Sequence, residues 1–330
     1  MHELLLLVGV LLLVFAVVDL LWTTLWVDGG AGPLSSRMME GLWRGLRAAS
    51  GDRSRVLSLA GPLVLVASLS AWVLLLWTGW TLVFAGGEDA LVVTGDPEPV
   101  TWTGRLWFVA YTLATVGNGD FSPNGGVWQV AASLTAFTGF TFITLAVTYV
   151  LSVLGAVASK RSFASGVTGR GTTGAAFARS GWNGSDFHAL DLPLNTLSAQ
   201  LDRLADQHET YPILHYYHSR RDEAASAVAV AVLDEALTVL CAGVPEEARP
   251  NGAVVEGARS SVQSYLRTLD AAFIEPTDHV PPPPDLDAVR AAGVPTVADG
   301  AFSEALADLE ERRRKLLGMV AADARAWPAA

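Results

Sequence analysis

The stretch Thr112-Leu113-Ala114-Thr115-Val116-Gly117-Asn118-Gly119-Asp120 decides the fold of this chain. A filter that strips water from a cation must aim successive carbonyl oxygens at one axis, which neither an ordinary helix nor an ordinary strand can do. Gly117 and Gly119 make such a path possible, because glycine readily adopts positive φ. Carbonyls on alternating residues can then turn inward, while Val116 packs outward and the Thr115 hydroxyl adds an oxygen at the inner end. The stretch therefore predicts an ion-conducting backbone.

This stretch resembles the signature of the potassium channel family, T-x-x-T-x-G-x-G-D, and matches all of its constrained positions. The resemblance implies that the permeant ion, K⁺, binds along Thr115, Val116, Gly117, Asn118 and Gly119. In the family the residue between the two glycines is most often a tyrosine that braces the filter. Asn118 can follow the same backbone path but lacks the aromatic ring. Two expectations stay open, a potassium channel and a non-selective monovalent cation channel.

The resemblance also implies which residues support the filter. In the family, aromatic residues at the positions of Trp107 and Phe108 form a cuff around it, and an aspartate at the position of Asp120 ends the signature. We expect Asp120 to brace the outer mouth. The residues expected to support the filter are Trp107, Phe108, Tyr111, Thr112 and Asp120.

Three apolar runs, at about 3–26, 56–84 and 127–157, each exceed the roughly 20 residues that cross a bilayer. Residues 101–114, between the second and third runs, have the right length for a pore helix. One pore loop per chain predicts a homotetramer, because four such loops complete a filter around one axis. We expect an all-α membrane protein with a pore-loop tetrameric cation channel fold, one extra N-terminal transmembrane helix and a cytosolic helical bundle.

The expected boundaries follow from these runs and from composition. They are 1–27 for the N-terminal transmembrane helix, 28–55 for a basic cytoplasmic loop, 56–158 for the pore domain, 159–190 for a flexible linker rich in Gly, Ser and Thr, and 191–330 for the cytosolic helical domain. Within the pore domain they are 56–84 for the outer helix, 101–114 for the pore helix, 115–119 for the filter and 127–157 for the inner helix.

Charge predicts the orientation. Residues 27–55 carry five arginines, whereas residues 85–100 carry four carboxylates and neither Lys nor Arg. By the positive-inside rule the first segment is cytoplasmic and the second lies outside. The chain is then a multi-pass protein of the cell membrane with its N-terminus outside and its C-terminus in the cytoplasm. The outer carboxylates would either concentrate cations at the pore mouth or simply be solvated.

Two positions inside the spans each have two interpretations. Asp19 either pairs with a neighbouring helix or faces water, or it is satisfied locally by Thr23 or Thr24. Gly139 stands where the family often has a hinge glycine, although membrane helices also carry glycine for close packing. The residues expected at the hinge and along the water-filled path are Gly139, Phe140, Ile143, Val147 and Leu151.

Composition limits the function classes. The chain is 51% hydrophobic and carries a net charge of −11, which argues against nucleic acid as a partner. Its single cysteine, Cys241, permits neither an intrachain disulfide nor a cysteine metal cluster. No nucleophile, catalytic carboxylate pair or convincing cofactor motif is visible, so we expect neither an enzyme nor a bound cofactor. Membrane lipid, the homotetramer and an unidentified cytosolic ligand or protein at the C-terminal domain are the expected partners.

The C-terminal half predicts a small helical bundle, with helices at about 194–208, 222–242, 253–272 and 301–327. Gly169, Gly171 and Gly174 spell G-x-G-x-x-G, but no apolar strand precedes them, so the context of a dinucleotide-binding turn is missing. An apolar repeat in the last helix favours an intrachain face over a tail that pairs with other chains.

Three histidines, His208, His215 and His218, fall close together. They would bind a metal or sense pH if they shared a helix, whereas Pro212 and neighbouring tyrosines favour a packed connection. A second function also stays open, in which the pore fold is only a membrane anchor and the cytosolic bundle binds a partner.

Overall fold

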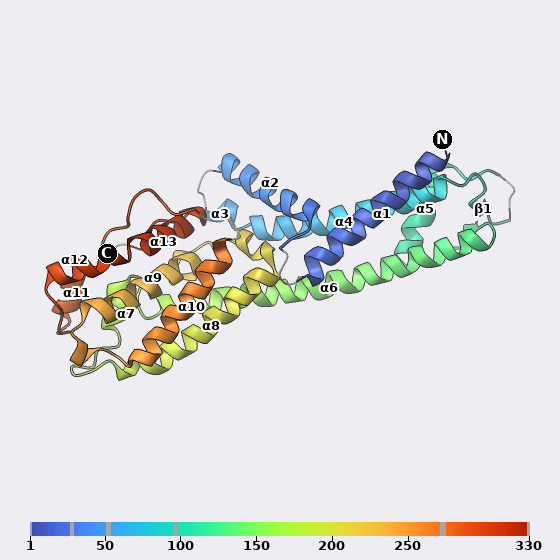
Figure 1. Ribbon diagram of the computed structural model, residues 1–330. Coiled ribbons are helices and arrows are strands. Elements are labelled where there is room, and N and C mark those ends of the chain that lie inside the picture. Colours follow the sequence, from blue (N-terminus) through green and yellow to red (C-terminus); the bar gives the residue numbers. More distant parts are fainter. Residues whose placement is uncertain (1, 27–29, 51–53, 96–97, 271–274, 329–330) are drawn as a thin grey trace. The chain divides into compact units, whose positions relative to one another are not determined.

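The computed structural model describes residues 2–26, 30–50, 54–95, 98–270 and 275–328, most of them in helices (Figure 1). The chain divides into two compact units. The first consists of Met1–Gly41 and Pro62–Val153, and the second of Leu42–Gly61 and Leu154–Ala330. Each unit has its own hydrophobic core. The long helix α6 (Gly126–Thr168) contributes residues to both units.

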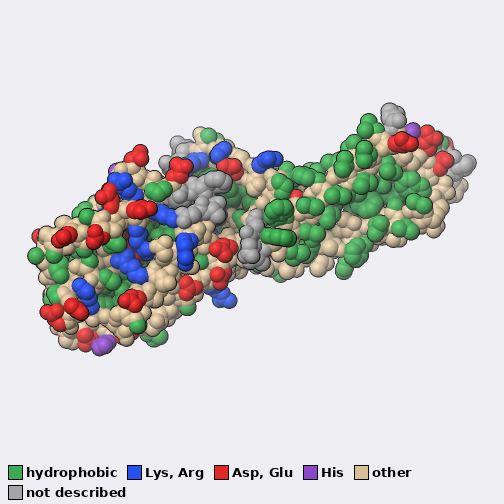
Figure 2. Space-filling view, viewed as in Figure 1, with side chains coloured by type: hydrophobic (Ala, Val, Ile, Leu, Met, Phe, Trp, Pro, Cys, Tyr) green, Lys and Arg blue, Asp and Glu red, His purple; other side chains and the backbone are tan. Residues whose placement is uncertain are grey.

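Apolar helices dominate the first unit. They are α1 (His2–Leu25), α4 (Ala60–Ala85) and the first part of α6. Figure 2 shows hydrophobic side chains spread over much of the visible face of this unit, with acidic side chains gathered at one end. Among the described residues, four helical stretches are long and apolar enough to cross a membrane: His2–Leu25, Arg55–Ala85, Gly126–Thr168 and Ser226–Gly243.

Small residues let α1 and α4 approach closely. A Cβ built on Gly9 would lie 2.7 Å from the carbonyl oxygen of Gly79, and one built on Gly79 would lie 2.8 Å from the Leu13 side chain. Membrane helices pack through such small residues because lipid supplies no hydrophobic force to drive them together. The contact makes α1 part of the first unit rather than a separate anchor.

A short helix, α5 (Trp102–Leu113), follows α4 and precedes α6 in the sequence. The side chain of Thr101 caps its amino-terminal end. The hydroxyl of Thr101 accepts a hydrogen bond from the Gly104 amide at 3.1 Å, which satisfies one of the free N–H groups of the first turn. The candidate filter begins at Thr115, after the C-cap residue Ala114. The chain then forms β2 (Phe121–Pro123), which pairs antiparallel with β1 (Leu91–Val93).

The second unit is a helical bundle. Its helices α8 (Asp191–Thr210) and α10 (Gly252–Asp270) pack together, while α7 (Gly174–Arg179) and α13 (Glu310–Ala322) both contact α9 (Ser226–Thr238). Two short helices, α11 (Leu286–Ala291) and α12 (Asp299–Asp308), complete it. Every residue of α9 is buried. This span-like helix is therefore the centre of the bundle.

Three sequence-based expectations differ from the structure. The expected flexible linker at 159–190 is wrong, because α6 continues to Thr168 and α7 follows it. Phe163, Val167 and Phe177 are fully buried in the core of the second unit. A high Gly, Ser and Thr content suggested a loop, but the apolar residues among them repeat at helical spacing.

The other two differences concern helix limits. The expected loop at 28–55 contains an amphipathic helix, α2 (Pro33–Ser50), and the ends of that loop fall partly on residues outside the described ranges. The expected helix at 301–327 is interrupted at Leu309, where α12 ends and α13 begins. Phe302, Leu316 and Val320 from this region are buried in the core of the second unit, as an intrachain apolar face predicts.

Candidate functional site

Along residues 115–119, after α5, the sign of the backbone φ angle alternates. Thr115, Gly117 and Gly119 have φ values of 56°, 66° and 84°, whereas Val116 and Asn118 between them do not have positive φ. In an ordinary strand successive carbonyls point to opposite sides. A backbone whose φ alternates in sign can turn successive carbonyls toward one side instead, which is what coordination of a dehydrated cation requires.

Thr115 is a feature that sequence reasoning missed. A β-branched residue with positive φ is a conformational outlier, and such strain costs on the order of 1–3 kcal/mol. Two hydrogen bonds to α5 hold the backbone there. The Thr115 amide donates to the Thr112 carbonyl at 3.0 Å, and the Val116 amide donates to the Tyr111 carbonyl at 2.8 Å. The start of the candidate filter is thus fixed to the carboxyl end of α5, where the partial negative charge of a helix favours a cation.

The carboxylate of Asp120 supports the carboxyl end of the candidate filter. It accepts a hydrogen bond from the indole Nε1 of Trp107 at 3.2 Å and another from the side-chain amide of Asn118. The Tyr111 hydroxyl donates to the carbonyl of Phe121 at 3.2 Å. Asn118 is therefore braced through a carboxylate and an indole, and it does not pack as an aromatic ring would.

The other expected support residues lie behind this path. Phe108 is buried, with its ring 5.0 Å from that of Phe84 and 5.4 Å from that of Tyr111, measured between centroids. The Thr112 hydroxyl donates to the Phe108 carbonyl at 2.7 Å, so this side chain satisfies its own helix. The packed aromatic rings give the candidate filter a rigid backing.

In a single chain the residues of the candidate filter are exposed. The side chain of Val116 is 70% exposed, and the other filter residues are exposed as well. The expected path-lining residues of α6 are also exposed: Phe140, Ile143, Val147 and Leu151. Apolar surface of this extent needs cover from lipid or from further copies of the chain.

Gly139 lies where α6 passes the end of α5. A Cβ at this position would fall inside van der Waals contact with the carbonyl oxygen of Leu113. The structure therefore gives this glycine a packing role, and α6 is helical on both sides of it. Its expected role as a hinge stays a prediction.

Asp19 is fully buried and pairs with other elements of the first unit. Its carboxylate accepts hydrogen bonds from the Trp72 indole at 2.9 Å, the Leu34 amide at 2.8 Å and the Ser35 hydroxyl at 2.5 Å. Thr23 donates instead to the backbone carbonyl of Asp19. Through these hydrogen bonds the carboxylate joins α1 to α4 and to the first turn of α2. This agrees with the expectation that Asp19 pairs with a neighbouring helix.

The three histidines do not share a site. The rings of His208 and His215 are in contact, with centroids 4.8 Å apart, whereas Nδ1 of His218 lies 3.3 Å from a carboxylate oxygen of Asp323. Across the described residues, no group of three His, Cys, Asp or Glu side chains could hold a metal ion. The metal hypothesis for these histidines has no geometric support.

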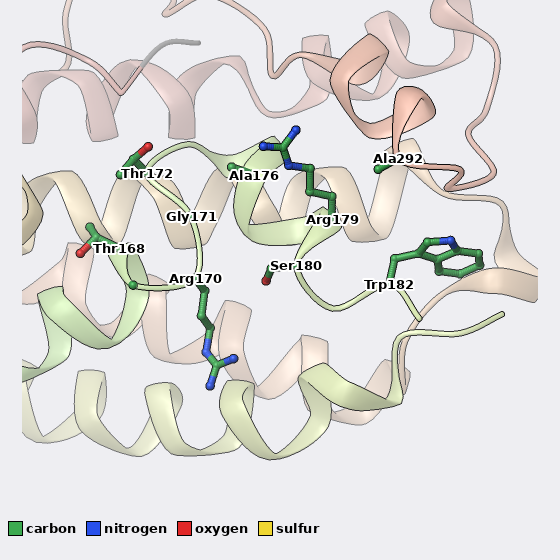
Figure 3. Close-up of a pocket in the computed structure, with 10 residues that line it drawn as sticks. Thr168, Arg170, Gly171, Thr172, Ala176, Arg179, Ser180, Trp182 and Ala292 are labelled. Carbon is green, nitrogen blue, oxygen red and sulfur yellow. The ribbon is translucent and has the colours of Figure 1, made fainter. Parts of the chain in front are cut away.

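An open pocket of about 700 Å³ is a second candidate site, and it lies in the second unit (Figure 3). Figure 3 shows the side chains of Arg170 and Arg179 leaving it in different directions, so they do not converge on one anion. Gly171 packs against the backbone of Phe177, and Gly174 packs against Glu235. Close packing therefore explains these two glycines of the G-x-G-x-x-G pattern without a ligand.

Comparison with known proteins agrees with the geometry of the first unit. The sequence model of a family described as "Ion channel" matches residues 70–156, which include most of α4, all of α5, the candidate filter and much of α6. The uncharacterized membrane protein YdjJ of Bacillus subtilis (strain 168) is 43% identical over 328 residues, covering 99% of this chain and 96% of that protein. No solved structure matches the chain.

Proposed function

This chain belongs to the ion channel family, and from that membership we propose that it is a tetrameric potassium channel of the cell membrane. Four copies of residues 115–119 would surround one axis and pass K⁺ along backbone carbonyls. The alternating φ of Thr115, Gly117 and Gly119 is the observation that carries this proposal. A passive pore of this kind needs neither a cofactor nor a catalytic residue.

The tetramer follows from the need to enclose the ion. A dehydrated cation requires oxygens on all sides, and one chain supplies carbonyls from one side only. Cyclic assembly of four identical loops supplies the rest. The exposed side chains of Phe140, Ile143, Val147 and Leu151 would then line the path below the filter, and Gly139 would be the point at which α6 bends during gating.

The orientation rests on charge. The arginines of α2 would face the cytoplasm, and the acidic loop before α5 would face outside, where its carboxylates would raise the local concentration of cations. The second unit would then be cytosolic. A ligand or protein that binds it could act on the pore through α6, since that helix contributes to both units.

Asn118 favours one alternative within the same class. Its amide donates a hydrogen bond to the carboxylate of Asp120, and position 118 adds no aromatic ring of its own to the packing around the filter. A less rigid filter would discriminate K⁺ from Na⁺ less well, which would make the protein a non-selective monovalent cation channel. In the other alternative, the pore fold is only a membrane anchor and conduction is weak or lost.

Reversal potentials separate these functions. The purified protein would be reconstituted in planar bilayers with opposed potassium and sodium gradients. A reversal near the potassium equilibrium potential supports a selective potassium channel, and one near zero supports the non-selective pore. The absence of current at any voltage or pH would contradict both and favour the anchor.

A further inference from the structure

The carboxyl end of the candidate filter is held by a residue outside the family signature. The hydroxyl of Thr94 donates a hydrogen bond to the carbonyl oxygen of Gly119 at 2.8 Å. The backbone amide of the same residue donates to the carbonyl of Asp120 at 3.0 Å. One residue thus binds two consecutive carbonyls at the point where the filter ends.

The two-stranded sheet determines the position of Thr94. This residue follows β1 directly, and Val93 of β1 is paired with Phe121 of β2. The amide of Asn124 donates to the carbonyl of Ala90 at 2.9 Å and closes the other end of the pairing. Ala90 and Leu91 are buried in the same core as Phe108 and Tyr111. The sheet is therefore anchored on the aromatic residues behind the filter.

Residues 118–121 are consequently held from two sides. The α5 side contributes the bonds from Trp107 to Asp120 and from Tyr111 to Phe121. The β1 side contributes both bonds from Thr94. A carbonyl that already accepts a bond from a protein hydroxyl is less free to rotate toward a passing ion than one that does not.

We propose that Thr94 is a positioning residue for ion selectivity, holding the Gly119 carbonyl against the β1–β2 sheet and replacing the aromatic brace that Asn118 cannot supply. This inference rests on the proposed channel function. It implies that the ligands for the dehydrated ion are the oxygens of Thr115, Val116, Gly117 and Asn118, and that the Gly119 carbonyl serves the structure of the exit.

The test compares three variants. Thr94→Val has nearly the same shape and keeps the backbone amide, but it lacks the hydroxyl. Thr94→Ser keeps the hydroxyl. Ser122→Ala is the matched control, because it removes the Ser122 hydroxyl that is hydrogen-bonded to the Thr94 hydroxyl at 3.3 Å and leaves both bonds of Thr94 to the Gly119 and Asp120 carbonyls in place. Reversal potentials are measured in bilayers, and amide hydrogen exchange is measured over residues 115–121.

We expect Thr94→Val to move the reversal potential toward zero and to speed amide exchange at the end of the filter by about two- to tenfold, the range for one lost hydrogen bond. Thr94→Ser and Ser122→Ala should match the wild type in both measurements. Unchanged exchange in α4 and α6 shows that Thr94→Val is folded. If Thr94→Val behaves as the wild type in both assays, the inference is wrong.

The exchange measurement also separates this inference from the proposed function. A wild type without current would contradict the channel, and faster exchange in Thr94→Val alone would still support the brace. A conducting wild type with an unaffected Thr94→Val would contradict the brace and leave the channel standing.

Discussion

Gly139 of α6 lies directly against the carbonyl oxygen of Leu113, the last residue of α5. The contact places α6 immediately behind the start of the candidate filter. Because the neighbour is backbone, it cannot rotate away as a side chain could. We expect Gly139→Ala to separate the two helices, to lower the yield of folded assembly and to abolish current, as measured by size-exclusion chromatography in detergent and by bilayer recording.

Gly155→Ala is the control for this change. Gly155 lies on the same helix, and a Cβ there would meet nothing within 4 Å, so alanine should stabilise the helix by roughly 1 kcal/mol. If Gly139 acts only as a hinge, Gly139→Ala should instead assemble normally and change only the open probability. A fully assembled Gly139→Ala protein would contradict the packing explanation.

Asp19→Ala removes the acceptor shared by the Trp72 indole, the Ser35 hydroxyl and the Leu34 amide. Each buried donor left without a partner costs about 1–3 kcal/mol. We expect a clear fall in the melting temperature of the protein in detergent, followed by tryptophan fluorescence. Thr24→Ala is the control, because the Thr24 hydroxyl donates to the Leu20 carbonyl of its own helix at 2.8 Å, and its loss should change the melting temperature little.

The buried pair of Glu235 and Arg313 joins α9 to α13 in the second unit, with 2.9 Å between carboxylate oxygen and guanidinium nitrogen. Arg313→Met leaves a carboxylate buried without its cation, and such a change costs roughly 3–5 kcal/mol. The double variant Glu235→Leu with Arg313→Met removes both charges and should recover most of that loss. Chemical denaturation of the four proteins of the cycle measures this coupling. Equal destabilisation of the single and double variants would show that the pair has no special role.

Acid should destabilise the second unit through two histidines, the buried His208 and the half-buried His215. Burial lowers the pKa of His215 to about 4, with a contribution from the charge of Lys160, and burial lowers the pKa of His208 well below its usual range. Both stay neutral in the folded state, whereas the unfolded chain binds protons below about pH 6.5. Their contribution to stability is therefore complete above pH 6.5 and is lost as the pH falls toward 4, by up to about 3 kcal/mol for His215.

The melting temperature between pH 7 and pH 5 checks this expectation. The double variant His208→Gln with His215→Gln should show a weaker dependence on pH than the wild type. His188→Gln is the control, because it makes the same substitution at a histidine whose ring is exposed. A double variant with the wild-type profile would rule out these two histidines as the source of acid sensitivity.

The sequence predicted those parts of the molecule that depend on local pattern. Apolar runs identified α1, α4 and α6, and the resemblance to the potassium channel family was confirmed by the family match to residues 70–156. The glycine spacing predicted positive φ at Gly117 and Gly119. In each case the residue type itself carries the physical property, either apolarity or freedom of φ.

Features that depend on tertiary contacts were not predictable in the same way. Positive φ at Thr115 results from hydrogen bonds to the end of α5 and not from its own preference. The partner of Asp19 on α4, Trp72, is 53 residues away. The β1–β2 sheet has three residues in each strand, which is too short for an alternating pattern to be visible. The polar composition of 159–190 concealed a helix, because a few buried residues outweigh many exposed ones.

The central claim is that residues 115–119 form the conducting path, and a comparison of Gly117→Ala with Gly125→Ala in planar bilayers tests it most directly. Both glycines have positive φ, 66° and 83°, and a Cβ on either meets nothing within 4 Å, so alanine imposes a similar strain of about 1–2 kcal/mol at each. Only Gly117 lies in the filter. We predict that Gly125→Ala conducts as the wild type does and that Gly117→Ala carries no selective cation current. A wild-type current in Gly117→Ala would contradict the assignment of the filter.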